Sequence, residues 1–167
     1  REPEHYTFLK ETVLPWAVEN AKNHELRIWS AGCSSGEECY TTAMLLDEYF
    51  GREKPMWDTR ILATDISHSV MDKAKKGIYN VEGMKGLSNE WVRRYFNKVD
   101  DEHYEICQAI KDEIIFKPFN LMDPMPEKYK LRPFDLIFCR NVMIYFDQPT
   151  KNALVNRFYE VLKPGGY

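Results

Sequence analysis

The sequence predicts an α/β fold in which a mostly parallel sheet carries helices on both of its faces. Strand-like and helix-like segments alternate along the chain, an order typical of doubly wound sheets. The 167 residues are enough for one domain with a real core and too few for two ordinary domains. Hydrophobic residues make up 44% of the chain and charged residues 29%, a composition that is globular and not disordered.

The first third of the chain predicts a helix, a strand and a second helix. Helical periodicity runs over 5–22, where Pro15 should break the helix or open a second one. The apolar segment ELRIWSAG, 25–32, predicts a buried strand. An amphipathic helix is expected over 36–50, and Gly51 is a plausible stop for it.

The middle of the chain continues the alternation and then becomes less regular. TRILATD, 59–65, predicts a second strand, and a short helix is expected over 67–77. Ser67 is the expected N-cap of that helix, and Gly77 lies past its end. SNEWVRRYF, 88–96, predicts another short helix.

The last part of the chain predicts strands followed by a final helix. Residues 103–110 and 113–120 predict two strands joined by a short Lys-Asp turn, in an antiparallel excursion from the main sheet. PFDLIFCRN, 133–141, predicts a buried strand, and 150–163 predicts an amphipathic helix. The apolar face of that helix consists of Leu154, Val155, Phe158, Val161 and Leu162.

The turn AGCSSGEE, 31–38, carries the clearest indication of a ligand. It follows the first strand and opens a helix, where doubly wound folds commonly bind ligands. Gly32 and Gly36 allow a tight turn and close approach of the backbone. The turn matches neither GxGxxG nor the P-loop pattern, and Glu37 and Glu38 would repel a phosphate. A cationic ligand fits better, and S-adenosylmethionine carries a sulfonium and an ammonium but no phosphate.

Each of these features also has a purely structural interpretation. Ser35 and Glu38 have the spacing of a capping box, so Glu38 could simply satisfy backbone donors. Asp65 ends the second predicted strand, where an acid commonly binds ribose hydroxyls, although aspartate also caps helices and turns. The turn and the acid together favour a nucleoside ligand without phosphate.

Charge and composition exclude several other classes of function. A formal net charge of −3 disfavours a general nucleic-acid binder, which needs a basic face. No apolar run reaches the roughly 20 residues of a membrane span. The four cysteines lack zinc-ligand spacing, so we expect no metal site and reduced thiols in a cytoplasmic protein.

Several longer segments resemble the chemotaxis receptor methyltransferases, the CheR family. They are RIWSAGCSSGEECYTTAMLL, LATDISHSVMDKAKKGIY, PFNLMD and, most specifically, PFDLIFCRNVMIYFD followed by VLKPGG. The resemblance implies a Rossmann-like methyltransferase domain over 1–167 that uses S-adenosylmethionine and releases S-adenosylhomocysteine. It also implies a small β-subdomain at 96–120 and a sheet whose last strands lie beyond this chain, which would be a fragment.

The resemblance assigns roles to individual residues. The family's cofactor contacts fall on Arg1, Glu38, Asp65, Asn120, Leu121, Arg140 and Asn141. Tyr145, with Arg1, falls near the transferred methyl group and the incoming glutamate. One departure is Cys39, where the family usually has proline after the two glutamates; a proline there would only stiffen the first helical turn.

Methyl transfer to glutamate needs orientation more than acid–base chemistry. A glutamate carboxylate, with a pKa near ~4.3, is already ionised at neutral pH, so no general base is required. Arg1 and Arg140 could hold that carboxylate, and Tyr145 could donate a hydrogen bond. Alternatively, Arg140 forms a structural ion pair and Tyr145 packs a strand–helix connection.

The implied partner is the cytoplasmic helical region of a chemotaxis receptor. Some family members also bind a receptor C-terminal peptide at the edge of the β-subdomain, through a glycine-bearing loop. NKVDDEHYE, 97–105, has no glycine, so we expect no such tether. A methyltransferase acting on another substrate and a non-catalytic domain that binds S-adenosylmethionine remain open alternatives.

Overall fold

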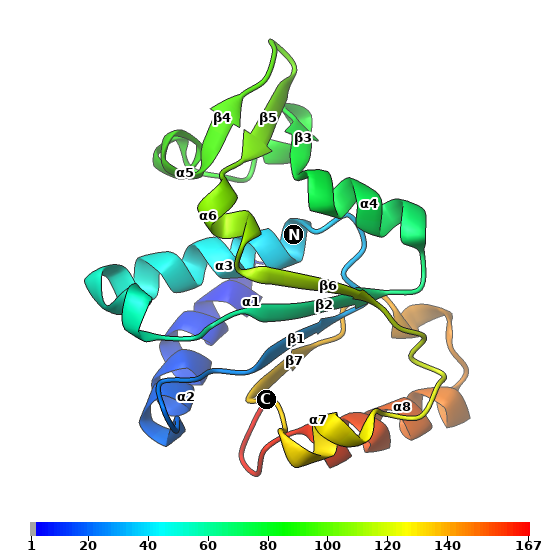
Figure 1. Ribbon diagram of the computed structural model, residues 1–167. Coiled ribbons are helices and arrows are strands. Elements are labelled where there is room, and N and C mark those ends of the chain that lie inside the picture. Colours follow the sequence, from blue (N-terminus) through cyan, green and yellow to red (C-terminus); the bar gives the residue numbers. More distant parts are fainter. Residues whose placement is uncertain (1–2) are drawn as a thin grey trace.

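The computed structural model describes residues 3–167 and has the predicted parallel sheet at its centre (Figure 1). Four strands lie in the order β6-β2-β1-β7, and every neighbouring pair is parallel. They are β1 (Ile28–Ala31), β2 (Ile61–Asp65), β6 (Ile114–Pro118) and β7 (Leu136–Phe138). Because all four run the same way, their carboxyl ends meet along one edge of the sheet.

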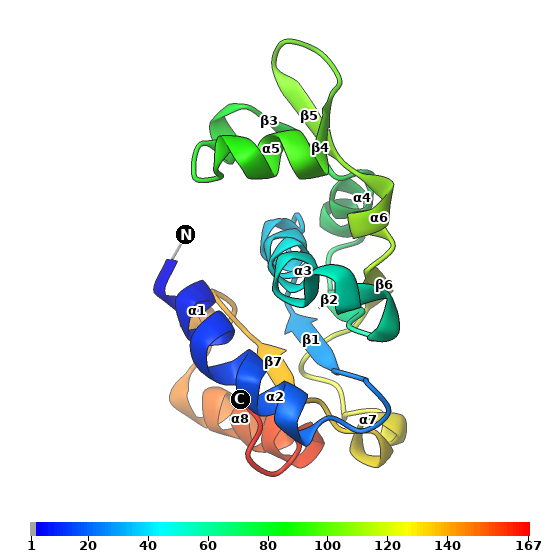
Figure 2. The same cartoon turned by 90° about the vertical axis from the view of Figure 1, so that its left-hand side faces the viewer.

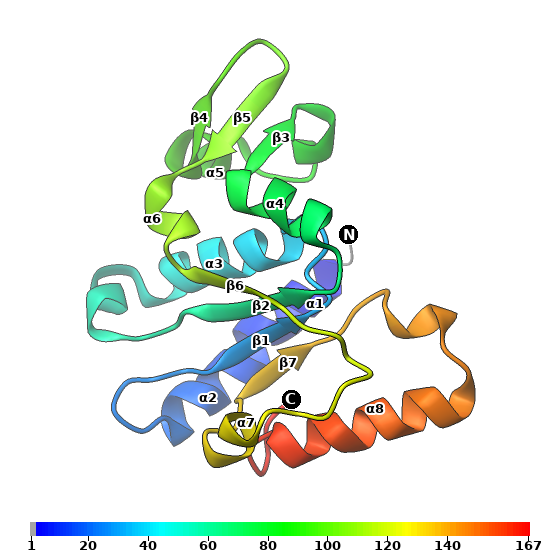
Figure 3. The same ribbon diagram turned by 45° about the vertical axis from the view of Figure 1, so that its right-hand side comes forward.

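Helices cover both faces of this sheet, as predicted (Figures 2 and 3). The opening helical segment, α3 and α4 pack on one face, where a core cluster includes Leu9, Ile28 and Met44. On the other face α7 and α8 pack around Trp29. The helices of the two faces are α1 (Pro3–Phe8), α2 (Leu14–Asn20), α3 (Glu37–Phe50), α4 (His68–Lys76), α7 (Glu127–Leu131) and α8 (Gln148–Val161).

Pro15 opens a second helix, one of the two outcomes that the sequence predicts. It lies in the first turn of α2, where its missing N–H costs nothing. A π-helical turn, η1 (Leu9–Val13), joins α1 to α2, and the Leu14 N–H donates to the Leu9 carbonyl. This wider turn lets the helical segment continue past a residue that would otherwise break it.

The small antiparallel sheet forms from other residues than the sequence analysis expects. Its order is β3-β5-β4, and it projects beyond the main sheet with α5 beside it (Figure 1). Its strands are β3 (Ile78–Asn80), β4 (Phe96–Lys98) and β5 (His103–Ile106), and the neighbouring short elements are η3 (Glu82–Met84) and α5 (Asn89–Tyr95). The sheet therefore spans 78–106 and not 96–120.

The expected pairing of 103–110 with 113–120 is wrong. Residues 108–111 form the short helix α6 (Gln108–Lys111), and β6 pairs in parallel with β2, from Ile61 opposite Ile114 to Asp65 opposite Pro118. Strand propensity identified both segments but could not choose their partners, because pairing depends on the global topology.

Helix boundaries follow the predicted signals more closely. The Ser67 side chain accepts a hydrogen bond from Val70 N at 3.4 Å, and Gly77 ends α4 with φ of 63°. In α8, Leu154 and Phe158 are buried as predicted, but Val155 is 51% exposed. Val155 follows Leu154 directly, so the helix turns it by about 100° away from the core.

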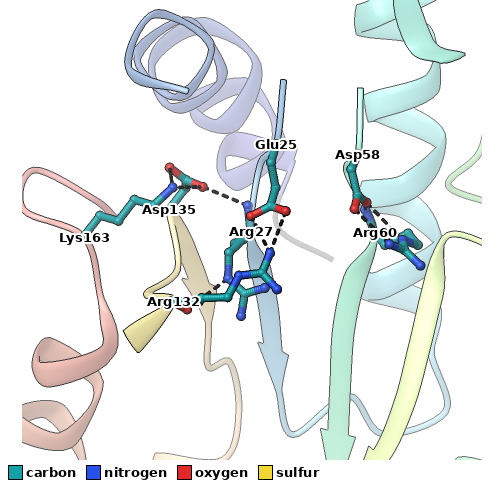
Figure 4. Close-up of polar contacts among 7 residues, drawn as sticks. All are labelled: Glu25, Arg27, Asp58, Arg60, Arg132, Asp135 and Lys163. Carbon is teal, nitrogen blue, oxygen red and sulfur yellow. Dashed lines mark hydrogen bonds and ion pairs between the residues drawn. The ribbon is translucent and has the colours of Figure 1, made fainter. Parts of the chain in front are cut away.

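A polar network holds the amino-terminal edge of the sheet (Figure 4). Asp135 is 1% exposed, accepts Arg27 N at 2.8 Å and pairs with Lys163 Nζ at 3.0 Å from each carboxylate oxygen. Nearby, Arg132 contacts Glu25 at 2.7 Å. The buried carboxylate thus ties β1 to the approach of β7 and to the chain after α8.

We expect Asp135→Ala to lower the free energy of unfolding by about 3 kcal/mol, because it leaves both partners of a buried carboxylate without their acceptor. The Arg27 N–H and the Lys163 ammonium would lose their acceptor, a carboxylate that is 1% exposed, while the Lys163 side chain is 28% exposed. Urea denaturation measures the change. Arg60→Ala is the matched control, since its pair with Asp58 is on the surface and should contribute less than about 1 kcal/mol. An equal loss in both variants would contradict this account.

The ladder of the main sheet continues outside β7 at the last residue. Tyr167 N donates to the Asp135 carbonyl at 3.1 Å, and Ile137 N donates to the Tyr167 carbonyl at 2.8 Å. This is the pattern of a parallel neighbour.

No helix within residues 3–167 is both long and apolar enough to cross a membrane.

Candidate cofactor site

A pocket of about 730 Å³ opens at the carboxyl edge of the sheet. Such a volume lies in the range of small-molecule sites. The turn after β1 forms one wall, α1 and α3 form another, and the segment before α5 closes a third. The residues that define these walls include Tyr6, Gly32, Ser34, Glu38, Asp65, Trp91 and Arg140.

The turn after β1 is bent tightly against the end of β2. Gly32 N and Cys33 N both donate to the Thr64 carbonyl at 2.8 Å. Gly32 has φ of 79°, and a Cβ atom there would overlap Val142 Cγ2. Only glycine meets both demands, so the tight turn that the sequence predicts at this position depends on it.

Asp65 ties the two strand–helix turns of the site together. Its Oδ2 accepts Ser34 N at 2.9 Å and its Oδ1 accepts Ser67 N at 3.0 Å. The turn interpretation of this residue is therefore correct, and the residue also lines the pocket. Each carboxylate oxygen has a second lone pair, so the side chain retains capacity for hydroxyl donors of a ligand.

Glu38 pairs with Arg140 and does not cap α3. Glu38 Oε2 lies 2.9 Å from Arg140 Nη1, and the two side chains are only 20% and 18% exposed. Burial raises the pKa of Glu38, and the Arg140 charge opposes that rise. The N-cap of α3 is Gly36, with no side-chain cap hydrogen bond, and Ser35 Oγ donates to Glu37 Oε2 at 2.5 Å. The capping-box interpretation is wrong.

The charges that line the pocket favour a cationic ligand. Among the described lining residues, the carboxylates are Glu37, Glu38 and Asp65, and the only guanidinium is that of Arg140. The excess of two negative charges would repel phosphate and attract a sulfonium or an ammonium. Within residues 3–167 no cluster of three or more His, Cys, Asp or Glu side chains could hold a metal ion.

The structure brings part of the expected residue set to this pocket. Glu38, Asp65, Arg140 and Asn141 line it. Arg1 lies outside the described residues.

The remaining members of the set lie away from the pocket walls. Asn120 accepts Met122 N at 2.9 Å through Oδ1 in the turn after β6. Leu121 is buried in the cluster around Trp29. Tyr145, in the single turn η4 (Met143–Tyr145), is 84% exposed.

The outer wall of the pocket consists of residues that the sequence does not predict. Tyr6 reaches it from α1, Thr41 from α3, and Leu87 and Trp91 from the other side. Trp91 is held there by a hydrogen bond from Nε1 to Glu48 Oε2 at 2.6 Å. Nothing local in the sequence marks these residues, because only the packing of distant segments brings them together.

Two thiols near the pocket, the buried Cys39 and the half-buried Cys139, have raised pKa values. Burial raises the pKa of Cys139 to about 11, and the Glu38 charge adds to the rise. A side-chain hydrogen bond with Cys33, together with burial, raises the pKa of Cys39. All four cysteines are free.

We expect iodoacetamide at pH 8 to modify Cys139 very slowly in the folded protein, because on the order of one thiol in a thousand would be ionised. Mass spectrometry after a timed exposure measures the modified fraction. The same exposure in urea is the control and should modify Cys139 rapidly, since unfolding removes the burial. Equal rates with and without urea would contradict the assigned environment of Cys139.

Comparisons with known proteins place this geometry in context. The sequence profile described as "CheR methyltransferase, SAM binding domain" matches residues 1–167. A chemotaxis protein methyltransferase of Borreliella burgdorferi is 46% identical over 100% of this chain and 59% of its own length. Chemotaxis protein methyltransferase 1 of Pseudomonas aeruginosa is 39% identical over 97% of this chain and 59% of its own length.

The chain thus spans about three fifths of the length of these curated relatives. Among solved structures, the DszA carbon methyltransferase superposes with a TM-score of 0.52 at 16% identity, over 98% of this chain and 34% of that one. At that identity the likeness bears on the fold alone.

Proposed function

Because this chain belongs to the CheR methyltransferase family, we propose that its acidic pocket binds S-adenosylmethionine and that the longer protein methylates glutamate side chains of chemotaxis receptors. The products would be a glutamate methyl ester and S-adenosylhomocysteine. The observation that carries the proposal is the net negative pocket at the turn after β1, within a domain of this family. We place the reaction in the cytoplasm, beside the helical region of the receptor.

The pocket residues offer complementary contacts for the parts of this cofactor. Asp65 would accept the ribose hydroxyls, since its carboxylate is already fixed by Ser34 N and Ser67 N. The acidic wall would stabilise the sulfonium and ammonium charges. Arg140, oriented by Glu38, would hold a carboxylate, either of the cofactor or of the incoming glutamate.

The chemistry needs alignment and no proton transfer. Bound S-adenosylmethionine would supply an electrophilic methyl group. The glutamate carboxylate is ionised at neutral pH, so the chain needs no general base. Its residues would position the carboxylate oxygen in line with the methyl carbon and the sulfur, which accounts for much of the rate gain in such displacements.

Five further residues keep proposed roles that follow from the family resemblance. Arg1 and Tyr145 would lie near the transferred methyl group, and Asn120, Leu121 and Asn141 would contact the cofactor. The role of Asn141 is supported by its position in the pocket lining. Its backbone has an unusual positive φ of 61°. Tyr145 is exposed, so its role requires that the docked receptor cover it.

Methyl transfer tests the proposal directly. The full-length protein is mixed with methyl-labelled S-adenosylmethionine and a receptor cytoplasmic fragment, and base-labile label on the receptor is counted. A receptor whose methylated glutamates are replaced by glutamine is the control and should remain unlabelled. Cofactor binding without transfer would instead support a non-catalytic domain, and label on the control receptor would support another substrate group.

We also propose that this protein docks to receptors without a C-terminal peptide tether. The β4–β5 turn is short and closed, with His103 Nδ1 2.8 Å from Asp100 Oδ1, and β4 offers only three residues at the sheet edge. Binding of a receptor C-terminal peptide should be undetectable by calorimetry at micromolar concentrations. A clear micromolar affinity would overturn this view.

A further inference from the structure

A second pocket, of about 270 Å³, lies on the opposite face of the sheet and toward its amino edge. The exposed parts of β2 and β6 form its floor, and α7 forms one side. In Figure 1 α7 and α8 pack below β1 and β7, while β6 is the outermost strand. The edge strand β6 is therefore only partly covered on this face.

The charge of this pocket is opposite to that of the cofactor site. Five cationic side chains line it, against the two carboxylates of Glu25 and Asp58, in a chain whose net charge is −3. The cations are Arg27, Arg60, Lys117, Lys128 and Arg132. The local excess of three positive charges is therefore concentrated on one face of an acidic chain.

The two carboxylates are already engaged and leave cations without acidic partners. Glu25 pairs with Arg132 at 2.7 Å and Asp58 with Arg60 at 2.9 Å (Figure 4). Lys117 and Lys128 form no ion pair with any residue from 3 to 167. Arg27 lies beside Arg132, because its Nε donates a hydrogen bond to the Arg132 carbonyl at 3.0 Å. Burial lowers the pKa of Arg27, and the nearby Arg132 charge lowers it further.

Apolar side chains are exposed beside these charges. Ile115 on β6 lines the groove and is 38% exposed, and Leu62 on β2 lines the floor beside it. Lys128 Nζ lies 5.6 Å from the centroid of the Tyr129 ring, so its stem covers part of α7. Cationic and apolar side chains therefore line the same groove.

We propose that this groove binds an acidic segment of a partner protein in which glutamate or aspartate alternates with apolar side chains. The carboxylates of the partner would pair with Lys117 and Lys128, and its apolar side chains would cover Leu62 and Ile115. Electrostatic complementarity of this kind gives specificity and fast association. The groove lies toward the amino edge of the sheet and the acidic cofactor pocket at its carboxyl edge, and they share no lining residue, so both ligands can bind at once.

A labelled synthetic peptide tests the proposal. The probe is a fluorescein-labelled 15-residue peptide of repeated Glu-Glu-Leu, titrated with the full-length protein at low salt and followed by fluorescence anisotropy. The charge-reversal variant Lys117→Glu/Lys128→Glu should bind at least 10-fold more weakly. Its matched control, Lys73→Glu/Lys76→Glu, makes the same change of net charge on α4, across the sheet, and should bind within 2-fold of the native protein.

The outcomes separate this proposal from its rivals and from the proposed function. An equal loss of peptide affinity in both variants would show that binding depends only on the net charge of the protein, and it would contradict the proposed binding site in the groove. Displacement of the peptide by low-millimolar inorganic phosphate would indicate a small-anion site and overturn the peptide proposal, as would absence of binding. Both variants should keep native affinity for S-adenosylmethionine, so a failure here leaves the cofactor site untouched.

Discussion

Asp65→Ala is expected to weaken the binding of S-adenosylmethionine at least 100-fold. The substitution removes the acceptor proposed for the ribose hydroxyls, and hydrogen bonds to a charged group contribute about 1.5–3 kcal/mol each. It also releases Ser34 N and Ser67 N, which Asp65 holds at 2.9 and 3.0 Å, so the turn that forms the pocket wall loosens. A loss of about 2.7 kcal/mol corresponds to that 100-fold change. Isothermal titration calorimetry measures the affinity.

Two further variants control for the Asp65 result. Asp72→Ala removes an exposed carboxylate of α4, close in sequence but outside the pocket, and should bind within 2-fold of the native protein. Asp65→Asn keeps one carbonyl oxygen and should fall between the native protein and Asp65→Ala. Native affinity in a folded Asp65→Ala variant would remove this residue from the cofactor site.

Arg140→Ala is expected to lower the free energy of unfolding by about 3 kcal/mol at pH 8 and to abolish methyl transfer. It leaves the Glu38 carboxylate in the pocket wall without the guanidinium that lies 2.9 Å away. Removing one member of a largely buried pair costs more than the pair itself contributes, because the other charge remains desolvated. Urea denaturation measures the stability, and label transfer to a receptor fragment measures the activity.

The stability of this variant should also depend on pH in a defined direction. Burial already raises the pKa of Glu38, and the loss of Arg140 removes the main opposing charge, so the pKa rises further. The folded state then binds a proton more readily than the unfolded chain, and its stability falls as pH increases through the folded-state pKa. The destabilisation relative to the native protein should therefore be smaller at pH 5 than at pH 8.

The double variant Glu38→Gln/Arg140→Ala is the matched control. A neutral amide costs less to leave unpaired than a carboxylate, so the double variant should be more stable than Arg140→Ala alone at pH 8. It should also lose the extra pH dependence. Additive losses from the two single changes would show that Glu38 and Arg140 do not act as a pair.

The sequence predicted the main sheet and the principal turn of the site because their signals are local. Gly32 was predicted from its place after an apolar strand, and its φ of 79° confirms the reason. Helix α4 begins after Ser67 and ends before Gly77, as the capping preferences of these residues indicate. Such features depend on a few neighbouring residues, so one sequence is enough to find them.

The features that sequence reasoning missed depend on long-range partners. Glu38 had the spacing of a cap, but Arg140, 102 positions away, pairs with it. The strand at 114–118 was found, but its parallel partner β2 could not be inferred from periodicity. The outer pocket wall at Trp91 depends on the placement of a subdomain whose first strand, β3, has only three residues.

Calorimetric titration of the native protein with two sulfur nucleosides and one dinucleotide is the most direct test of the central claim. S-adenosylmethionine and S-adenosylhomocysteine should each bind once per chain, because neither carries a phosphate that the pocket carboxylates would repel. They should compete with each other, because both would occupy the same pocket. Nicotinamide adenine dinucleotide should show no binding, since its pyrophosphate would meet the carboxylates of Glu37, Glu38 and Asp65. Binding of the dinucleotide at the pocket, or no binding of either sulfur nucleoside, would contradict the account.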